Sequence, residues 1–598
     1  RLPEEARGKV WVADLKQAGI ENYGKFFNRG FSYSHTSVIS KYKYMLPGAM
    51  ELFFNTRPMH LVRWPKEGWL RISDLVDPHG DAKGYGGELQ KGRFRYSGDR
   101  PERWKDEQEI WIAGYFMCEW DKIHTAVVSI DTDNKIMNLA PDTRWVRGSY
   151  AYDMLVRRDA PYYLYNILSE LSVAEEFYID RARGLLYFYP PEKIEGSEII
   201  VSTLEQPIVE LKGVSHLVFF GLTMEATWGN AIEMTNGQDN LIAGCTIRNT
   251  GNMGVYGKSG WNHSIVGCDI YDTGEGGICV GGGDRERLIP SGHYVENNHI
   301  YRFNRFSHGG GKFGIVMSGI GNRASHNVVS DGTYIAILFG GNDNIVESNE
   351  VYDVMYEARD GGAIYIHSGD EYLGNRGNVM RYNFIHHING DDSPIKTHEG
   401  HTGLYIDGIS AGMTMEGNVF YLTTYRAMQN HAPDTRMENN IFIDNALGIY
   451  QYSNAHILAR ENESVDWWAK SMTNPMYKRN PWSSRYPQMK QIGLDGYPVG
   501  LAKNIVLERN INTGGIFVSI EPVIFSQDID MKNNWDEGCP FFINPQQMDF
   551  RIRSGSPVFG ITGAEAVDVG AIGVYKDPLR ASWPIKKIPA GKYYKGGL

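Results

Sequence analysis

Residues 360–367 have the sequence Asp-Gly-Gly-Ala-Ile-Tyr-Ile-His, and residues 402–407 have the sequence Thr-Gly-Leu-Tyr-Ile-Asp. In both stretches apolar residues alternate with polar or aromatic ones, which is the period of a β-strand with one buried face. Alignment of the two stretches pairs Ile364 with Leu404, Tyr365 with Tyr405, Ile366 with Ile406 and His367 with Asp407. This match predicts equivalent strands on successive coils of a parallel β-helix.

A second marker recurs from about residue 206 onward: an asparagine followed two places later by an apolar residue. It occurs at Asn298, Asn327, Asn349, Asn383, Asn418 and Asn440, and Cys245 and Cys268 hold the same position earlier. The steps are 23, 30, 29, 22, 34, 35 and 22 residues, so one coil takes about 22 residues and the longer steps add a loop. We expect the asparagines to form an internal ladder, in which each amide bonds to its neighbours and to turn backbone.

The first 205 residues lack this repeat. Their strands are rich in aromatic residues and are separated by Gly, Pro and Asp clusters, which is typical of a β-sandwich-like domain. Two short helices are expected as well, at residues 13–18 and 155–171. The sequence therefore predicts an all-β protein, with a β-rich domain at residues 1–205 and a right-handed parallel β-helix at residues 206–598. The β-helix has inserted loops, an excursion at about residues 453–500 and a C-terminal cap.

Composition excludes several classes of protein. The net charge of −11 and the pI near 5.9 argue against nucleic acid or an anionic membrane as partner. Five cysteines are few and odd in number, so a disulfide framework is not expected. No stretch approaches the roughly 18 consecutive apolar residues of a membrane span. The chain begins at Arg1 and not at Met, so an export signal could have been removed, and we expect a secreted or periplasmic protein.

The outer face of the predicted coils changes character along the β-helix. The two outward columns are Val316, Leu338, Tyr365, Tyr405, Gln429 and Ser318, Gly340, His367, Asp407, His431. The early coils thus carry apolar or small residues in these columns, whereas three later coils, which span about 10 Å, carry Tyr, His, Asp and Gln. The steps of 34 and 35 residues insert loops beside these coils, and Glu357, Asp360, Asp370, Glu399 and His401 lie on the adjoining turns and loops. Ionisable groups that converge in this way predict a ligand-binding or catalytic site.

Each of these residues also has a structural interpretation. Asp407 beside His367 could be an ordinary surface pair, Tyr365 and Tyr405 an ordinary stacked ladder, and Asp360 a turn residue before two glycines. The chain has no HExxH, CxxC or EF-hand spacing, so no cofactor is expected. Calcium on the Asp-rich loops stays open as an alternative.

Several stretches carry a resemblance to a known family. They are residues 51–59, residues 98–104, residues 340–344, residues 360–363, residues 405–407 and residues 577–584. The chain resembles the bacterial right-handed parallel β-helix proteins grouped near glycoside hydrolase family 141. This resemblance implies an exo-acting α-L-fucosidase or xylanase activity, and more distantly that of the β-helix β-xylosidases and α-galactosidases. It also implies earlier coils before Arg1, so a missing N-terminal segment could be supplied by another chain or fragment.

Enzymes of this type use two carboxylates, and the matching positions are Asp360 and Asp407. One protonated carboxyl gives a proton to the leaving oxygen, and one ionised carboxylate acts on water or on the anomeric carbon. We assign the acid role to Asp360 and the base or nucleophile role to Asp407, and their spacing favours inversion; if Asp360 does not fold back, Glu399 or Asp370 takes its place. The predicted substrate-binding residues are His367, Tyr365, Tyr405, Gln429, His431, Glu357, Glu399 and His401. The alternatives are a polysaccharide lyase acting on a uronate-containing glycan and a non-catalytic carbohydrate-binding β-helix.

Overall fold

The structure is a computed structural model of the 598-residue chain. It describes residues 2–30, 46–81, 88–140, 144–145, 151–152, 155–307, 312–366, 374–390, 400–408, 410–453, 474–490, 502–522, 524 and 528–587.

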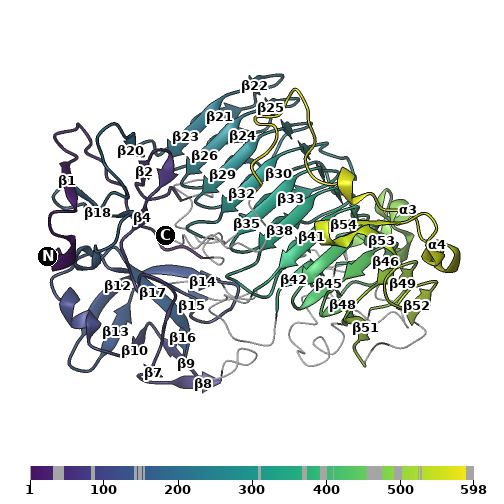
Figure 1. Ribbon diagram of the computed structural model, residues 1–598, viewed down its shortest axis with the longest axis horizontal. Helices are drawn as coiled ribbons and strands as arrows, with labels where there is room; N and C mark the ends of the chain where they lie inside the picture. Colours follow the sequence, from purple (N-terminus) through teal and green to yellow (C-terminus); the bar gives the residue numbers. More distant parts are fainter. Residues whose placement is uncertain are drawn as a thin grey trace.

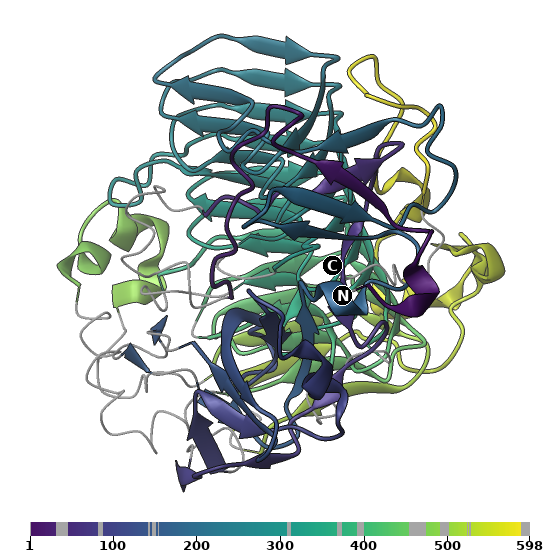
Figure 2. The same ribbon diagram turned by 90° about the vertical axis from the view of Figure 1, so that its left-hand side faces the viewer.

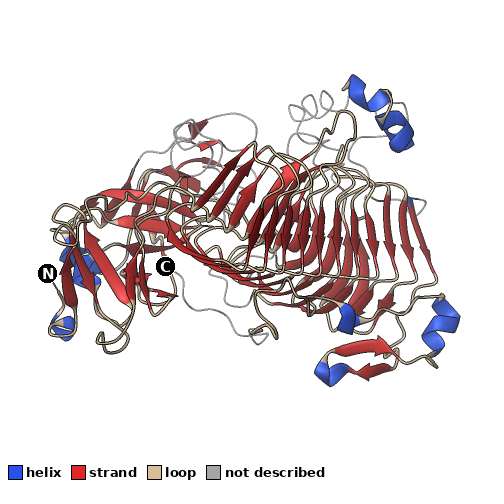
Figure 3. Cartoon of the chain, turned by 90° about the horizontal axis from the view of Figure 1, so that it is seen from above, coloured by secondary structure: helices blue, strands red, loops and turns tan. Residues whose placement is uncertain are grey.

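Most of the chain forms a right-handed parallel β-helix of three long parallel sheets, as the repeat predicts (Figure 1, Figure 3). The first sheet contains β21 (Val209–Lys212), β24 (Ile232–Thr235), β27 (Val255–Gly257), β30 (Ile278–Gly282), β33 (Ile315–Gly319), β36 (Ile337–Phe339), β39 (Gly362–Ile366), β42 (Thr402–Ile406), β45 (Arg426–Asn430), β48 (Leu447–Gln451) and β51 (Ile516–Ile520). The second sheet contains β22 (Val218–Phe220), β25 (Leu241–Ala243), β28 (Ser264–Val266), β31 (Tyr294–Glu296), β34 (Arg323–Ser325), β37 (Ile345–Glu347), β40 (Val379–Arg381), β43 (Thr414–Glu416), β46 (Thr435–Glu438), β49 (Ile505–Glu508) and β52 (Ile529–Lys532). The third sheet contains β23 (Thr223–Thr227), β26 (Thr246–Thr250), β29 (Asp269–Thr273), β32 (His299–Phe303), β35 (Val328–Gly332), β38 (Glu350–Val354), β41 (Phe384–Ile388), β44 (Val419–Thr423), β47 (Ile441–Ile443) and β50 (Ile511–Asn512).

The predicted strand register is confirmed at the coils that carry the opening motifs. The pairs in register between β39 and β42 are Ile364 with Leu404, Tyr365 with Tyr405 and Ile366 with Ile406. The next strand, β45, continues the columns with Met428, Gln429 and Asn430. The inward residues Ile364, Ile366, Leu404 and Ile406 are fully buried in one continuous apolar core, which neighbouring coils complete for each other.

The asparagine ladder is also confirmed, and Asn383 shows its geometry. Its side chain donates to the Val346 carbonyl at 2.9 Å and to Asn418 Oδ1 at 2.9 Å, and it accepts from the Asn349 side chain at 3.0 Å. In the earlier coils the backbone N–H of Cys268 donates to Asn298 Oδ1 at 2.9 Å, so cysteine holds the same position there. Each buried amide thereby hydrogen-bonds to backbone groups at the turns and to the next asparagine in the column.

The N-terminal region is a β-sandwich-like pair of sheets. One sheet contains β1 (Trp11–Asp14), β19 (Leu185–Phe188), β18 (Glu176–Asp180) and β4 (His60–Leu61). The larger sheet contains β5 (Arg63–Trp64), β17 (Pro161–Tyr165), β11 (Trp111–Gly114), β12 (Ile123–Asp131), β13 (Ile136–Leu139), β10 (Arg93–Arg95) and β7 (Asp74–Leu75), with β6 (Leu70–Arg71) on β17. A core that includes Phe177 and Phe188 from one sheet and Trp111 and Tyr165 from the other lies between them.

Smaller elements complete the N-terminal region. They are η1 (Glu4–Ala6), β2 (Leu52–Phe54), β3 (Arg57–Pro58), β8 (His79–Asp81), β9 (Glu88–Lys91), η4 (Arg100–Trp104), β14 (Arg144–Trp145), β15 (Ala151–Tyr152), β16 (Leu155–Arg157), η5 (Leu168–Glu170) and β20 (Ile199–Val201). The two short helices expected here are wrong. Residues 11–14 pair with β19 and residues 15–19 form a turn, while most of residues 155–165 lie in β16 and β17 and only the short η5 is helical in the second range. Pairing with partner strands outweighs the weak local preference for helix.

The C-terminal part packs along the side of the β-helix. Its elements are β53 (Phe542–Asn544), η9 (Pro545–Gln547), β54 (Asp549–Ile552), α4 (Pro557–Thr562) and η10 (Val569–Ala571). The helices η6 (Pro475–Lys478), α3 (Trp482–Arg485) and η7 (Pro487–Lys490) belong instead to the excursion between β48 and β49, where the Trp482 indole donates to the Arg285 carbonyl at 2.9 Å. Phe550 and Val558 pack on outward residues of the third sheet such as Phe384. The tail then runs back along the coils, where Arg580 pairs with Asp269 and Lys587 with Glu350 (the yellow trace in Figure 2).

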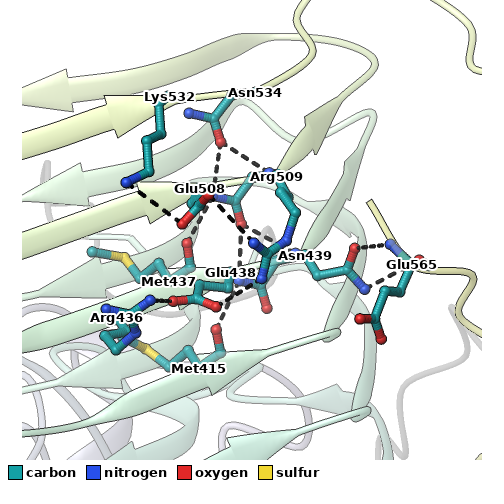
Figure 4. Close-up of polar contacts among 12 residues, drawn as sticks. Met415, Arg436, Met437, Glu438, Asn439, Glu508, Arg509, Lys532, Asn534 and Glu565 are labelled. Carbon is teal, nitrogen blue, oxygen red and sulfur yellow. Dashed lines mark hydrogen bonds and ion pairs between the residues drawn. The ribbon is translucent and has the colours of Figure 1, made fainter. Parts of the chain in front are cut away.

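The outer face of the second sheet carries a ladder of charges. Glu438 lies between Arg436 and Arg509, the latter at 3.0 Å, and Glu508 lies 3.3 Å from Arg509 and 3.9 Å from Lys532 (Figure 4). Glu416, Glu438 and Glu508 stack in one column on successive coils, and the arginines and Lys532 beside them offset the repulsion between these like charges.

Candidate functional site

Asp407 follows β42 directly and lies on the outer face of the first sheet, where it accepts hydrogen bonds from three neutral groups. The Tyr365 hydroxyl donates to its Oδ2 at 2.6 Å, and the Tyr405 hydroxyl donates to its Oδ1 at 3.2 Å. The backbone N–H of Gly408 donates to Oδ1 at 2.6 Å. Its side chain is 24% exposed, so it is partly withdrawn from water but open on one side. Three donors on one carboxylate stabilise its ionised form.

The two tyrosines reach Asp407 because strand register stacks them one coil apart. Their rings lie 5.3 Å apart in an edge-to-face arrangement, and Tyr405 is 6% exposed. Burial raises the pKa of the Tyr365 phenol well above its ordinary value, and the negative charge of Asp407 adds to this effect. Tyr365 therefore stays protonated and acts as a permanent donor.

The next coil adds His431, which is 6% exposed and lies with Nδ1 3.6 Å from Asp407 Oδ1. Its Nε2 lies 2.9 Å from the side-chain nitrogen of Gln429, whose oxygen accepts from Arg426 at 2.5 Å. The His431 ring packs on Tyr405 at 5.2 Å and on Tyr452 at 4.6 Å. The predicted group of Tyr365, Tyr405, Gln429, His431 and Asp407 is thus brought together.

Asp360 lies at the turn before β39, where the backbone is tightly packed. It has φ of +53°, and its carbonyl accepts a 2.7 Å hydrogen bond from the Tyr334 hydroxyl. A Cβ on Gly361 would lie 2.8 Å from the Tyr334 ring, and one on Gly362 would lie 2.8 Å from Tyr405 Cβ. The Asp-Gly-Gly motif therefore lets the chain pass between two buried tyrosines and holds Asp360 at the edge of the site.

Tyr334 connects the two acids electrostatically. Burial raises the pKa of its phenol well above the ordinary value, and the charges of Asp360 and Asp407 are the next largest causes, followed by that of Asp121. Asp360 and Asp407 therefore both lie near one buried phenol. Asp121, which is 4% exposed, approaches the same group from the N-terminal domain.

The N-terminal domain supplies partners that the sequence patterns did not reveal. The Lys122 ammonium lies 2.8 Å from Glu357 Oε1, and the Tyr115 hydroxyl donates to the same oxygen at 3.1 Å. The backbone N–H of Arg359 donates to the Glu119 carbonyl at 3.2 Å. Glu357 thus joins the domain to the β-helix beside the site. The segment 115–122 carries no recognisable motif, and its Tyr, Glu, Asp and Lys residues are the one sequence feature that could indicate a polar contact.

His401 lies just before β42 and is 2% exposed. Burial and the neighbouring Arg359 lower the pKa of His401 to about 3, although a backbone hydrogen bond at Ala358 opposes this shift. Its ring occupies the space beside Gly390, where a Cβ would collide with it. The substrate contact predicted for His401 stays a prediction.

Three further predicted residues fall outside the part of the chain that the structure describes. They are His367, Glu399 and Asp370. Among the described residues no group of three or more His, Cys, Asp or Glu could hold a metal ion. The Asp-rich loops named for calcium lie largely at residues 367–373 and 391–399, outside the described ranges.

A hollow lies elsewhere, where the N-terminal domain meets the β-helix. Phe26, Arg29, His124, Tyr165 and Phe306 are among the residues that line it, and none of the predicted site residues does. In the described ranges no helix is both long and apolar enough to cross a membrane.

Comparisons with known proteins concern the β-helix. The family model described as "Right handed beta helix region" matches residues 207–289. A solved structure described as a glycoside hydrolase is 13% identical, with 92% of this chain and 83% of that chain covered and a TM-score of 0.48. The structure of XylC with xylose is 10% identical, with 89% and 75% covered and a TM-score of 0.33.

The catalytic domain of a GH87 α-1,3-glucanase in complex with nigerose is 10% identical, with 82% of this chain and 99% of that chain covered and a TM-score of 0.28. No curated protein matches the sequence. The family model is defined by its fold and agrees with the observed coils, so the reaction has to be argued from the site.

Proposed function

We propose that the protein is a glycoside hydrolase that cleaves a carbohydrate on the outer face of the first sheet, with Asp407 and Asp360 as its two carboxylates. The observation that carries this proposal is Asp407 itself: a partly buried carboxylate held by two tyrosine hydroxyls and a backbone N–H, with Asp360 close enough to act on the same buried phenols, Tyr334 and Tyr365.

Asp407 is the ionised partner in this mechanism. The hydroxyls of Tyr365 and Tyr405 and the backbone N–H of Gly408 stabilise its ionised form, in which it acts on water or on the anomeric carbon. Asp360, at the turn one coil earlier, gives a proton to the leaving oxygen. The aromatic groups of Tyr365 and Tyr405 supply surface on which a sugar ring can pack.

The proposed substrate class follows from the sequence resemblance to glycoside hydrolase family 141. We propose an exo-acting enzyme for α-L-fucosides or a xylan-active enzyme, acting on a plant or algal glycan outside the cell. Screening of aryl glycosides, with fucosides and xylosides first, tests this substrate class directly.

The reaction type is tested by the products of the wild-type protein and of two variants, Asp407→Asn and Asp360→Asn. We expect reducing sugar without the ultraviolet absorbance of an unsaturated uronate, and a loss of about 10²- to 10⁴-fold in kcat in each variant. Asp530→Asn is the control, because Asp530 is an exposed acid on β52 that pairs with Lys532 at 3.0 Å.

Three results would overturn the proposal. Absorbance of an unsaturated uronate would make the protein a polysaccharide lyase. Tight glycan binding without turnover would make it a carbohydrate-binding β-helix. Full activity in both acid variants would place the chemistry elsewhere.

A further inference from the structure

A chain of polar contacts runs along the outer face of β45 and ends at Asp407. The Arg426 guanidinium donates to Gln429 Oε1 at 2.5 Å, Gln429 Nε2 lies 2.9 Å from His431 Nε2, and His431 Nδ1 lies 3.6 Å from Asp407 Oδ1. Gln429 and His431 are 7% and 6% exposed, so water does not set their orientation.

The arginine determines which way the glutamine amide points. A guanidinium has only donors, so the group of Gln429 that faces Arg426 must be the carbonyl oxygen. The NH₂ group of Gln429 then has to face His431 Nε2. The opposite orientation would place donor against donor and leave a buried contact unmade.

The glutamine in turn determines the tautomer of the histidine. An N–H that points at Nε2 requires a lone pair there, so Nε2 carries no proton. The proton of neutral His431 is then on Nδ1, the nitrogen that faces Asp407.

We infer that Arg426 and Gln429 are positioning residues that hold His431 neutral with its proton on Nδ1, aimed at the Asp407 carboxylate. The catalytic meaning of this relay rests on the proposed function, but the tautomer does not. The relay places the Nδ1–H of a neutral imidazole 3.6 Å from Asp407 Oδ1, where a small movement would bring it within hydrogen-bond distance of the carboxylate.

The surrounding rings keep the relay in place. The Arg426 guanidinium lies over the Tyr450 ring at 3.8 Å and over the Tyr425 ring at 4.3 Å. His431 is packed between Tyr405 and Tyr452. Such contacts favour a planar guanidinium over an ammonium, so a lysine at position 426 cannot fully replace the arginine.

The tautomer can be observed by NMR of the full-length protein labelled with ¹⁵N-histidine, with His431→Asn used to assign the signal. In the wild type we expect a protonated Nδ1 and an unprotonated Nε2. In Gln429→Glu the carboxylate can only accept, so we expect His431 Nε2 to become protonated. Gln238→Glu is the control, because it makes the same change of charge at an exposed position away from the site.

The same variants are assayed for kcat. We expect Gln429→Glu to lose about 10-fold, the cost of roughly one neutral hydrogen bond in the reacting state. A wild-type signal with Nε2 protonated, or an unchanged signal in Gln429→Glu, would overturn the inference. If instead the tautomer changes but no glycoside is hydrolysed by any form, the inference stands and the proposed function fails.

Discussion

Acidic side chains stand on the outer faces of the first and second sheets, but the two faces hold them differently. On the second sheet Glu438 and Glu508 stack on one another, and ion pairs with Arg436, Arg509 and Lys532 offset their charges (Figure 4). On the first sheet the donors seen on Asp407 are two phenols and a backbone N–H. The described partners of the acids therefore differ between the two faces.

Under the proposed function, this contrast separates structural acids from the catalytic one. A carboxylate between two cations is stabilised as a charge and has little tendency to bond to anything else. A carboxylate held by neutral donors stays ionised and keeps its negative charge available to a substrate. The chemistry of the partners, more than the presence of an acid, therefore distinguishes the site from the rest of the β-helix.

Among variants that change the partners of an acid, the largest effect is expected where a neutral donor is removed from Asp407. In Tyr365→Phe the 2.6 Å hydrogen bond is lost, and because such bonds to a charged group contribute about 1.5–3 kcal/mol, kcat/KM should fall about 10- to 100-fold. The melting temperature should move by no more than about 2 °C.

The matched control is Tyr301→Phe on the third sheet, where the ring stacks on Tyr271 at 4.7 Å. It removes the same hydroxyl group from an outward tyrosine far from Asp407 and should leave kcat/KM within two-fold. Equal losses in both variants would show that the phenols act through general stability, and the contrast between the two faces would not hold.

The sequence predicted the β-helix well because each coil repeats the same requirement. The asparagine column and the alternation around Ile364 fixed the register of coils that are up to 35 residues apart along the chain. Asp407, Tyr365, Tyr405 and His431 were predicted as a group for the same reason, since a residue on one strand implies its neighbours one coil away.

Contacts outside the repeat could not be predicted in this way. Lys122 and Asp121 approach the site from a domain more than 200 residues earlier, and no period relates them to Glu357 or Tyr334. The wrong helix at residues 13–18 has a similar cause: Ala, Leu, Lys and Gln favour helix locally, but residues 13 and 14 pair with β19 and the helical bonding stops at a single turn, in which the Ala18 N–H donates to the Asp14 carbonyl.

An intermediate effect is expected at Glu350 on the third sheet, an acid that pairs with the Lys587 ammonium and also contacts the buried His386 ring. Burial alone would raise its pKa, but His386 and the Lys587 ammonium outweigh burial and hold the pKa of Glu350 below 4.5. A lowered carboxyl pKa stabilises the fold above the unfolded value and loses that contribution as the pH falls through the folded value. Glu350→Gln should therefore cost about 1–2 kcal/mol at pH 7, and progressively less below about pH 4.5.

Chemical denaturation of the wild type and Glu350→Gln between pH 3 and pH 7 measures this difference. Glu296→Gln is the control, because Glu296 is bonded to the Tyr575 hydroxyl at an exposed position. A difference between wild type and Glu350→Gln that is the same at every pH would mean that Glu350 contributes through packing and not through its charge.

The smallest effect is expected in the charge ladder of the second sheet. Arg509 is 30% exposed and lies 3.0 Å from Glu438, which is 13% exposed, so solvent screens much of their attraction. Arg509→Met should lower the free energy of unfolding by no more than about 1 kcal/mol and leave kcat/KM within two-fold. Glu438 keeps Arg436 as a second partner in this variant, which limits the loss of stability further.

Raising the salt concentration should shrink the difference in stability between wild type and variant, because exposed pairs are screened within about 10 Å at 0.1 M salt. A large loss of activity in Arg509→Met would show that acids paired with cations on the second sheet also serve the reaction, and partner chemistry would then no longer distinguish the two faces.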